Sequence, residues 1–264
     1  MPKPNGMVLF QGRSLIDGQP IVVIATGLAS GSTNRKTGDM VQTYILRADA
    51  SPVEAIKAGA DVSICGDCPH RGDGTGKGRT CYVNVGQGPL AVWRAWKRGV
   101  YPVAGPDEVT GEYHSIPAIG RGRVVRLGTY GDPAAVPTWV WESITRFCVA
   151  HTGYTHQWRK CDPSLKALLM ASADSLADAA DAHAIGWRTF RVALPCDAPR
   201  VAGEAICPAS AEAGKKLTCA TCTACHGIGK GRRGSIVIQA HGGFAVMANI
   251  GRRASATPVS VTVS

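Results

Sequence analysis

The order of strand-like and helix-like segments after residue 123 constrains the fold most. Apolar or β-branched runs span residues 123–127, 149–155, 167–171, 187–194 and 235–240. Helix signals separate most of these runs: Asp132-Pro133 follows the first, and Ser175 opens a helix that Gly186 closes after the third. This alternation predicts an α/β fold of parallel β/α units, arranged as a partial barrel or a small open sheet.

The first 122 residues have a different pattern. Strand-like runs span residues 21–26 and 41–47, and Ser51, Pro52 and Glu54 give a capping-box start to a short helix. Residues 61–88 are rich in cysteine and glycine and are expected to be irregular, whereas residues 90–98 predict a helix. Apolar residues make 45% of the chain and charged residues 18%, which indicates a globular protein. We expect a single domain over residues 1–264, in which the N-terminal part (1–122) carries a first cysteine loop and the β/α units (123–264) carry a C-terminal cysteine cluster.

Polar side chains follow four of the predicted strands: Asp132, His156, Asp174 and His241. Active sites of parallel β/α folds lie at the carboxyl ends of the strands, so these four are candidate catalytic residues of one pocket. The alternative is structural, because Asp132 and Asp174 are also good helix caps and the two histidines can be packing or surface residues.

The strongest metal signal is the spacing Cys207-x11-Cys219-x2-Cys222-x2-Cys225. Three thiolates in one short loop suit three corners of a cubane iron–sulfur cluster, and a remote cysteine supplies the fourth. Zinc more often takes its ligands as two separated pairs. We predict a 4Fe–4S cluster at these cysteines, with zinc or unligated thiols as the alternatives.

A second metal signal is Cys65-x2-Cys68, followed after twelve residues by Cys81. Three cysteines could hold a second four-iron cluster with one iron open to substrate, or a zinc ion with one further ligand. A metal that only staples the glycine-rich loop is the structural alternative. The spacing does not decide the fourth ligand, and the candidates are His70, Cys148, Cys161 and Cys196.

The chain is basic, with 29 Lys and Arg against 19 Asp and Glu and a net charge of +10. Many of these residues flank the cysteines, and Lys and Arg on loops are typical contacts to a phosphate backbone. The alternative is that they solvate loops and offset the charge of metal-bound thiolates. The candidate nucleic-acid contacts are Lys215, Lys216, Lys230, Arg232 and Arg233.

No apolar run approaches the roughly 20 residues of a membrane helix, and the first residues do not begin a signal peptide. We therefore expect no membrane association and a location in the cytoplasm. In that reducing compartment, clustered cysteines are more often metal ligands than disulfides.

Several short segments combine into a pattern that marks a known family. They are Asn34–Gly38, Cys65–Pro69, Cys81-Tyr82, Tyr130–Pro133, Gly153–His156, Cys207–Ala209, Cys219-x2-Cys222-x2-Cys225 and Ala240–Gly242. In these segments, over about residues 30–243, the chain resembles the phage- and prophage-encoded proteins called gene product eighty-eight-like. The resemblance implies a phage or prophage origin and metal ligation by the matching cysteines. It implies no particular reaction.

Three functions follow from these patterns. The leading hypothesis is a phage-encoded iron–sulfur protein that binds or acts on nucleic acid. The second is a cluster-dependent, radical-type enzyme that modifies a nucleotide or nucleic acid, although the C-x3-C-x2-C loop of radical SAM enzymes does not occur. The third is a zinc-stapled DNA-binding protein without catalysis.

Overall fold

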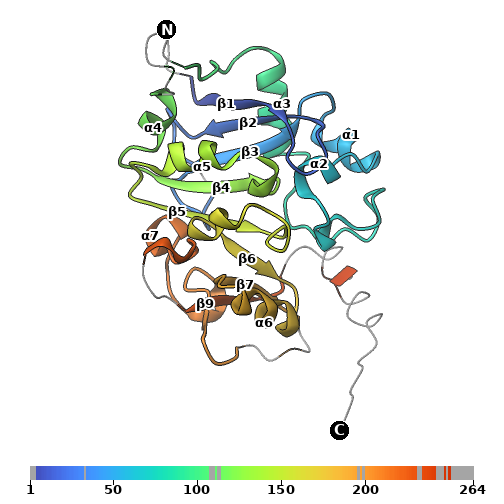
Figure 1. Cartoon of the computed structure of the whole chain (residues 1–264), viewed down its shortest axis with the longest axis vertical. Coiled ribbons are helices and arrows are strands. Elements are labelled where there is room, and N and C mark those ends of the chain that lie inside the picture. The colour runs from blue at the N-terminus through green and yellow to red at the C-terminus, as the bar shows by residue number, and fades with distance from the viewer. Residues whose placement is uncertain are drawn as a thin grey trace.

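The computed structural model describes residues 4–32, 34–106, 111, 114–194, 197, 200–230, 234–241, 247 and 249–250, without the side chain of Lys230. The described strands form one nine-stranded sheet in the order β1-β2-β3-β4-β5-β6-β7-β9-β8. Figure 1 shows this sheet along the long axis of the molecule, from β1 at one end to β9 near the other. The strands are β1 (Gly6–Arg13), β2 (Pro20–Thr26), β3 (Val41–Arg47), β4 (Val124–Tyr130), β5 (Ala150–Thr155), β6 (Met170–Ala173), β7 (Thr189–Ala193), β8 (Glu204–Ile206) and β9 (Ser235–Gln239).

The sheet is antiparallel at its N-terminal end and parallel elsewhere. β1 pairs with β2, and β2 with β3, in antiparallel register, whereas every neighbouring pair from β3 to β8 is parallel. The sheet is open, with β1 and β8 as its edges among the described strands. The predicted α/β class is therefore confirmed, and the open-sheet alternative holds over the partial barrel.

Short helices connect the strands. The first three helices of the chain pack beside β3. The helix over residues 138–145 packs against β4, and the helix over residues 176–184 packs against β6 and β7. The α-helices are α1 (Pro52–Lys57), α2 (Val62–Cys65), α3 (Gly88–Lys97), α4 (Ser115–Gly120), α5 (Thr138–Thr145), α6 (Leu176–Ala184) and α7 (Cys219–Cys222). The 3-10 helices are η1 (Pro69–Arg71), η2 (Pro133–Ala135), η3 (Pro163–Ala167), η4 (Ala211–Ala213) and η5 (Ile228–Lys230).

Local sequence signals set most of these boundaries. Ser51 caps α1 through a capping box with Glu54, and Ser175 caps α6, both as predicted. The predicted strand at residues 167–171 is displaced, because β6 starts only at Met170. A 3-10 turn occupies the preceding residues, since the Asp162 carboxylate accepts a hydrogen bond from the Ser164 N–H and starts η3.

The pairing of β5 changes along its length. Its first residues pair with β4, whereas Tyr154 and Thr155 pair with β6. Between these two pairings, the N–H of Gly153 donates to the carbonyl of Cys225 at 3.0 Å. The C-terminal cysteine segment thus lies against β5 and completes its backbone hydrogen bonding.

Candidate metal centres

The C-terminal cysteines come from neighbouring pieces of chain. Cys207 directly follows β8, Cys219 and Cys222 are the end residues of α7, and Cys225 lies in the segment that contacts β5. Cys207 and Cys225 are buried in a small apolar cluster that includes Ile236 of β9. This apolar cluster therefore holds the remote Cys207 together with Cys225 of the C-terminal tripod.

Backbone hydrogen bonds fix α7 to the segment that precedes β3. The N–H groups of Cys219 and Ala220 donate to the carbonyls of Lys36 and Thr37, each at 2.9 Å. Thr218 caps the helix through a capping box with Thr221. A four-residue helix is therefore held by tertiary contacts, because its own hydrogen bonds are too few to stabilise it.

The four thiols are close enough to act on each other electrostatically. Burial and the neighbouring Cys207, Cys219 and Cys222 raise the pKa of Cys225 to about 12, although a hydrogen bond from Tyr154 lowers it. Burial also raises the pKa of Cys207 and of Cys219, and every pair among the four contributes to these shifts. Burial therefore disfavours the thiolate forms of Cys207, Cys219 and Cys225 unless a cation balances their charge.

A buried arginine faces this cysteine group. Arg126 of β4 is only 9% exposed and donates a hydrogen bond to the Tyr82 hydroxyl at 2.6 Å. The pKa of Arg126 is raised by Tyr82, against burial, and also by Tyr154, Cys219 and Cys225. Among the described residues no carboxylate pairs with it, and its Nε atom has no hydrogen-bond partner there.

The first cysteine loop lies at the carboxyl ends of the parallel strands. The N–H of Asp132, just after β4, donates to the carbonyl of Ile64 in α2 at 2.6 Å. Burial, and then the neighbouring Cys68 and Cys81, raise the pKa of the Cys65 thiol well above its ordinary value. The structure therefore brings the three cysteines of this loop into one neighbourhood.

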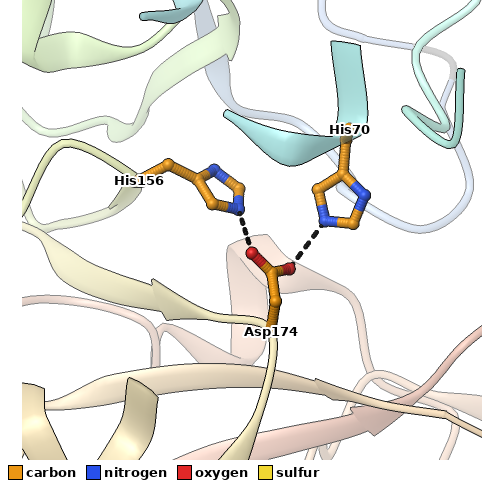
Figure 2. Close-up of side chains that lie close together, drawn as sticks. All are labelled: His70, His156 and Asp174. Atoms are coloured by element: carbon orange, nitrogen blue, oxygen red, sulfur yellow. Dashed lines mark hydrogen bonds and ion pairs between the residues drawn. The ribbon is translucent and has the colours of Figure 1, made fainter. Parts of the chain in front are cut away.

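Two histidines and one aspartate converge beside this loop. Figure 2 shows His70 of η1 and His156, which follows β5, on either side of Asp174, which follows β6. His70 Nε2 lies 2.9 Å from Asp174 Oδ1, and His156 Nε2 lies 3.3 Å from Asp174 Oδ2. Within the described part of the chain, only these three residues have ligand atoms that all lie within 4.8 Å of one another.

The electrostatics of this group favour the ionised form of Asp174. Burial alone would raise the pKa of Asp174, but His156 and His70 outweigh it and hold that pKa well below its usual range. Burial alone would lower the pKa of His156, but Asp174 and Cys68 outweigh it and raise that pKa well above its usual value. The site therefore attracts a cation or a proton.

Three of the four predicted catalytic residues lie together at the carboxyl ends of the parallel strands. The carboxylate of Asp132 accepts a hydrogen bond from the backbone N–H of His156 at 2.8 Å, and His156 contacts Asp174. His241 contacts different residues: its ring lies 2.9 Å from Lys36 Nζ and bonds to the carbonyl of Gln239.

The predicted nucleic-acid residues are only partly described. Lys215 and Lys216 are exposed between η4 and α7. Arg232 and Arg233 lie outside the described residues, as does the side chain of Lys230. Sequence reasoning considered His70 only as a cysteine-site ligand and did not single out Arg126, because no spacing rule connects either to its final neighbours.

Comparison with protein-family models, with curated proteins and with solved structures gave no significant match. The family resemblance therefore stays a prediction. No helix in the described part of the chain is both long and apolar enough to cross a membrane.

Proposed function

We propose that this chain is a phage-encoded iron–sulfur protein that binds or acts on nucleic acid in the host cytoplasm. One 4Fe–4S cluster would be held by Cys207, Cys219, Cys222 and Cys225. The observation that carries the proposal is Arg126, a buried cation that faces the cysteine group without a carboxylate partner among the described residues.

A buried unpaired guanidinium is costly, because its charge loses hydration without compensation. The Tyr82 hydroxyl accepts a hydrogen bond from one of its N–H groups, but no carboxylate among the described residues balances its charge. Four cysteine thiolates around a cluster give that centre a net negative charge, which would balance Arg126. The orphaned Arg126 Nε and the four thiols therefore fit an anionic metal centre better than a set of neutral thiols.

The described sulfur atoms do not have the spacing that a single tetrahedral zinc ion requires. A tetrahedral zinc with bonds of about 2.3 Å brings its sulfur ligands to about 3.8 Å from one another. No three cysteine sulfurs in the described chain lie within 4.8 Å of one another. A cubane separates them further, because each sulfur binds a different iron corner.

A cluster-dependent enzyme is the second candidate function, and one contact favours it. Cys68 of the first loop interacts with His156, one of the residues that line a cavity at the carboxyl ends of the strands. A second cluster at Cys65, Cys68 and Cys81 would leave one iron open beside that cavity. The same metal assay tests this candidate, since it predicts more than four irons per chain.

Metal analysis of anaerobically purified protein tests the proposal. We expect about four irons and four sulfides per chain at the C-terminal site, and their loss in Cys222→Ser. Cys148→Ser is the matched control, because Cys148 is a half-buried thiol just before β5, at the end of that strand opposite the first cysteine loop. Iron content that Cys222→Ser leaves unchanged would contradict the cluster, and zinc in place of iron would favour the zinc-stapled protein.

The nucleic-acid part of the proposal is tested by salt dependence. Binding affinity should fall with salt by a slope of about 0.9 per neutralised phosphate, so Lys215→Ala with Lys216→Ala should flatten the slope by about 1.8. The expected loss applies to all sequences alike, since these contacts would hold phosphate and not bases. Identical titration curves for the wild type and the double variant would argue that these lysines only solvate the loop.

A further inference from the structure

We propose that His70, His156 and Asp174 bind one divalent transition-metal ion, such as Zn²⁺ or Fe²⁺, at a site separate from the C-terminal cysteines. Both Nε2 atoms and the carboxylate would be its ligands. This inference goes beyond the iron–sulfur proposal and does not depend on it.

The spacing of the donor atoms fits one ion. Metal–nitrogen and metal–oxygen bonds of about 2.1 Å, at angles between about 90° and 109°, separate neighbouring ligand atoms by about 3.0 to 3.4 Å. The observed separations from the Asp174 oxygens are 2.9 Å to His70 Nε2 and 3.3 Å to His156 Nε2. The ion therefore requires little rearrangement of the side chains drawn in Figure 2.

The second ring nitrogen of His70 has a partner, which leaves its Nε2 atom for a metal. His70 Nδ1 lies 2.7 Å from the Thr80 hydroxyl, which can accept its proton, and Cys68 interacts with the His156 ring. Metal-binding histidines usually have such a partner on the second nitrogen, because it fixes the tautomer and the ring orientation.

The buried Nε2 atom of His156 is the independent observation that points to a ligand. It approaches Asp174 but forms no hydrogen bond with good geometry to any described residue. Native proteins rarely leave a buried polar nitrogen unsatisfied. A metal ion between this nitrogen and the carboxylate would satisfy it.

Both histidine ligands are held by the fold and not by Asp174 alone. His156 is fixed by its backbone hydrogen bond to buried Asp132, and the carbonyl of His70 accepts the N–H groups of Thr80 and Cys81. Ligands on such a fixed frame lose little conformational entropy on binding. The frame therefore resembles a preformed site.

One side of the site is open to a ligand. His156 and Asp174 line a cavity of about 360 Å³ that Arg159 and Lys160 also line. Two neutral imidazoles and one carboxylate would leave a divalent ion with a net charge of about +1 and a free coordination position. An oxyanion of a substrate, or water, fits that position, as in metal sites that keep three protein ligands.

Zinc binding to the full-length, cluster-loaded protein tests the proposal. After treatment with a mild chelator, each protein is dialysed against buffered free Zn²⁺, and bound zinc and iron are measured together. We expect the wild type to bind one zinc more than Asp174→Asn and His70→Gln, with at least about a 100-fold loss of affinity in each variant. Asp181→Asn and His114→Gln, which change the same residue types outside the site, should bind as the wild type does.

Two results would overturn the inference. The first is equal zinc binding by the wild type, Asp174→Asn and His70→Gln, each folded by circular dichroism; if Asp174→Asn fails to fold, His70→Gln decides. The second is an all-sulfur ligand shell for the additional zinc in X-ray absorption, which would place the ion at the cysteines. Cys222→Ser separates the two proposals, since it should lose iron and keep this zinc.

Discussion

Replacing Glu204 by glutamine should destabilise the protein more than any single change at an exposed ion pair. Glu204 at the start of β8 accepts two hydrogen bonds of 2.8 Å from Arg191 of β7, and both side chains are almost fully buried, with 1% and 0% exposure. The pair spans β9, which lies between the two strands. It therefore ties the three-residue edge strand to the sheet.

The magnitude follows from the burial. In Glu204→Gln the Arg191 guanidinium loses its bidentate carboxylate partner inside the sheet, and breaking such a pair costs about 3–5 kcal/mol. A domain of this size loses about 2–4 °C of Tm per kcal/mol, so Tm should fall by about 6–20 °C. Replacing both residues with apolar ones, Arg191→Met with Glu204→Leu, should restore most of the loss.

The pH dependence has a defined sign. Burial alone would raise the pKa of Glu204, but Arg191 and the Val201 N–H outweigh it and hold that pKa below its ordinary value. A carboxyl group with a lowered folded-state pKa contributes stability above its unfolded pKa, near 4.5, and loses it as the pH falls through the folded value. The difference between wild type and Glu204→Gln should therefore shrink below about pH 4.5.

Denaturant and thermal unfolding at pH 7 and pH 3.5 measure these effects. The control is Asp181→Asn, which removes one partner of Arg159 at a site that is 65% exposed and should cost less than about 1 kcal/mol. If Glu204→Gln and Asp181→Asn cost the same, the buried pair does not stabilise the sheet in the way argued.

Three further changes test other parts of the structure. Gly227→Ala should displace the C-terminal cysteine segment and lower the iron content, because a Cβ there would clash with the carbonyl of Lys166. Gly105→Ala is the control: a Cβ there meets open space, so this variant should keep its iron. Ser51→Ala should cost about 0.5–2 kcal/mol in chemical denaturation, since it removes the cap of α1. Trp141→Phe should cost about 1–3 kcal/mol, because the fully buried indole donates to a backbone carbonyl at 2.9 Å and that acceptor would lose its partner.

Much of the sheet could be predicted because its strands carry continuous apolar or β-branched runs. β3 matches the predicted residues 41–47, and β2 differs from its predicted run by one residue. β1 was not predicted, because Gly6 and Gly12 weaken the strand pattern. The structure gives the reason for Gly6: a Cβ there would lie 2.7 Å from the carbonyl of Ala25 on the partner strand.

The candidate site could be predicted only where topology connects its residues. His156 and Asp174 follow adjacent parallel strands, so a general rule brings them to one edge. His70 lies in the short 3-10 helix η1, 104 residues before Asp174, and no periodicity indicates where that segment folds. Its position two residues after Cys68 predicts a metal ligand, but one that completes the cysteine site and not one that joins Asp174 and His156.

The strand β5 connects the two proposed centres. Gly153 binds the carbonyl of Cys225, Tyr154 donates to the Cys225 thiol, and His156 contacts Asp174. Three residues of extended chain span roughly 10 Å, so these contacts place the two centres close together along one strand. β5 can reach both because its pairing changes from β4 to β6 midway, which leaves the Gly153 N–H to the cysteine segment. A disturbance of this strand should therefore affect both centres, whereas changes in α7 or η1 each affect one.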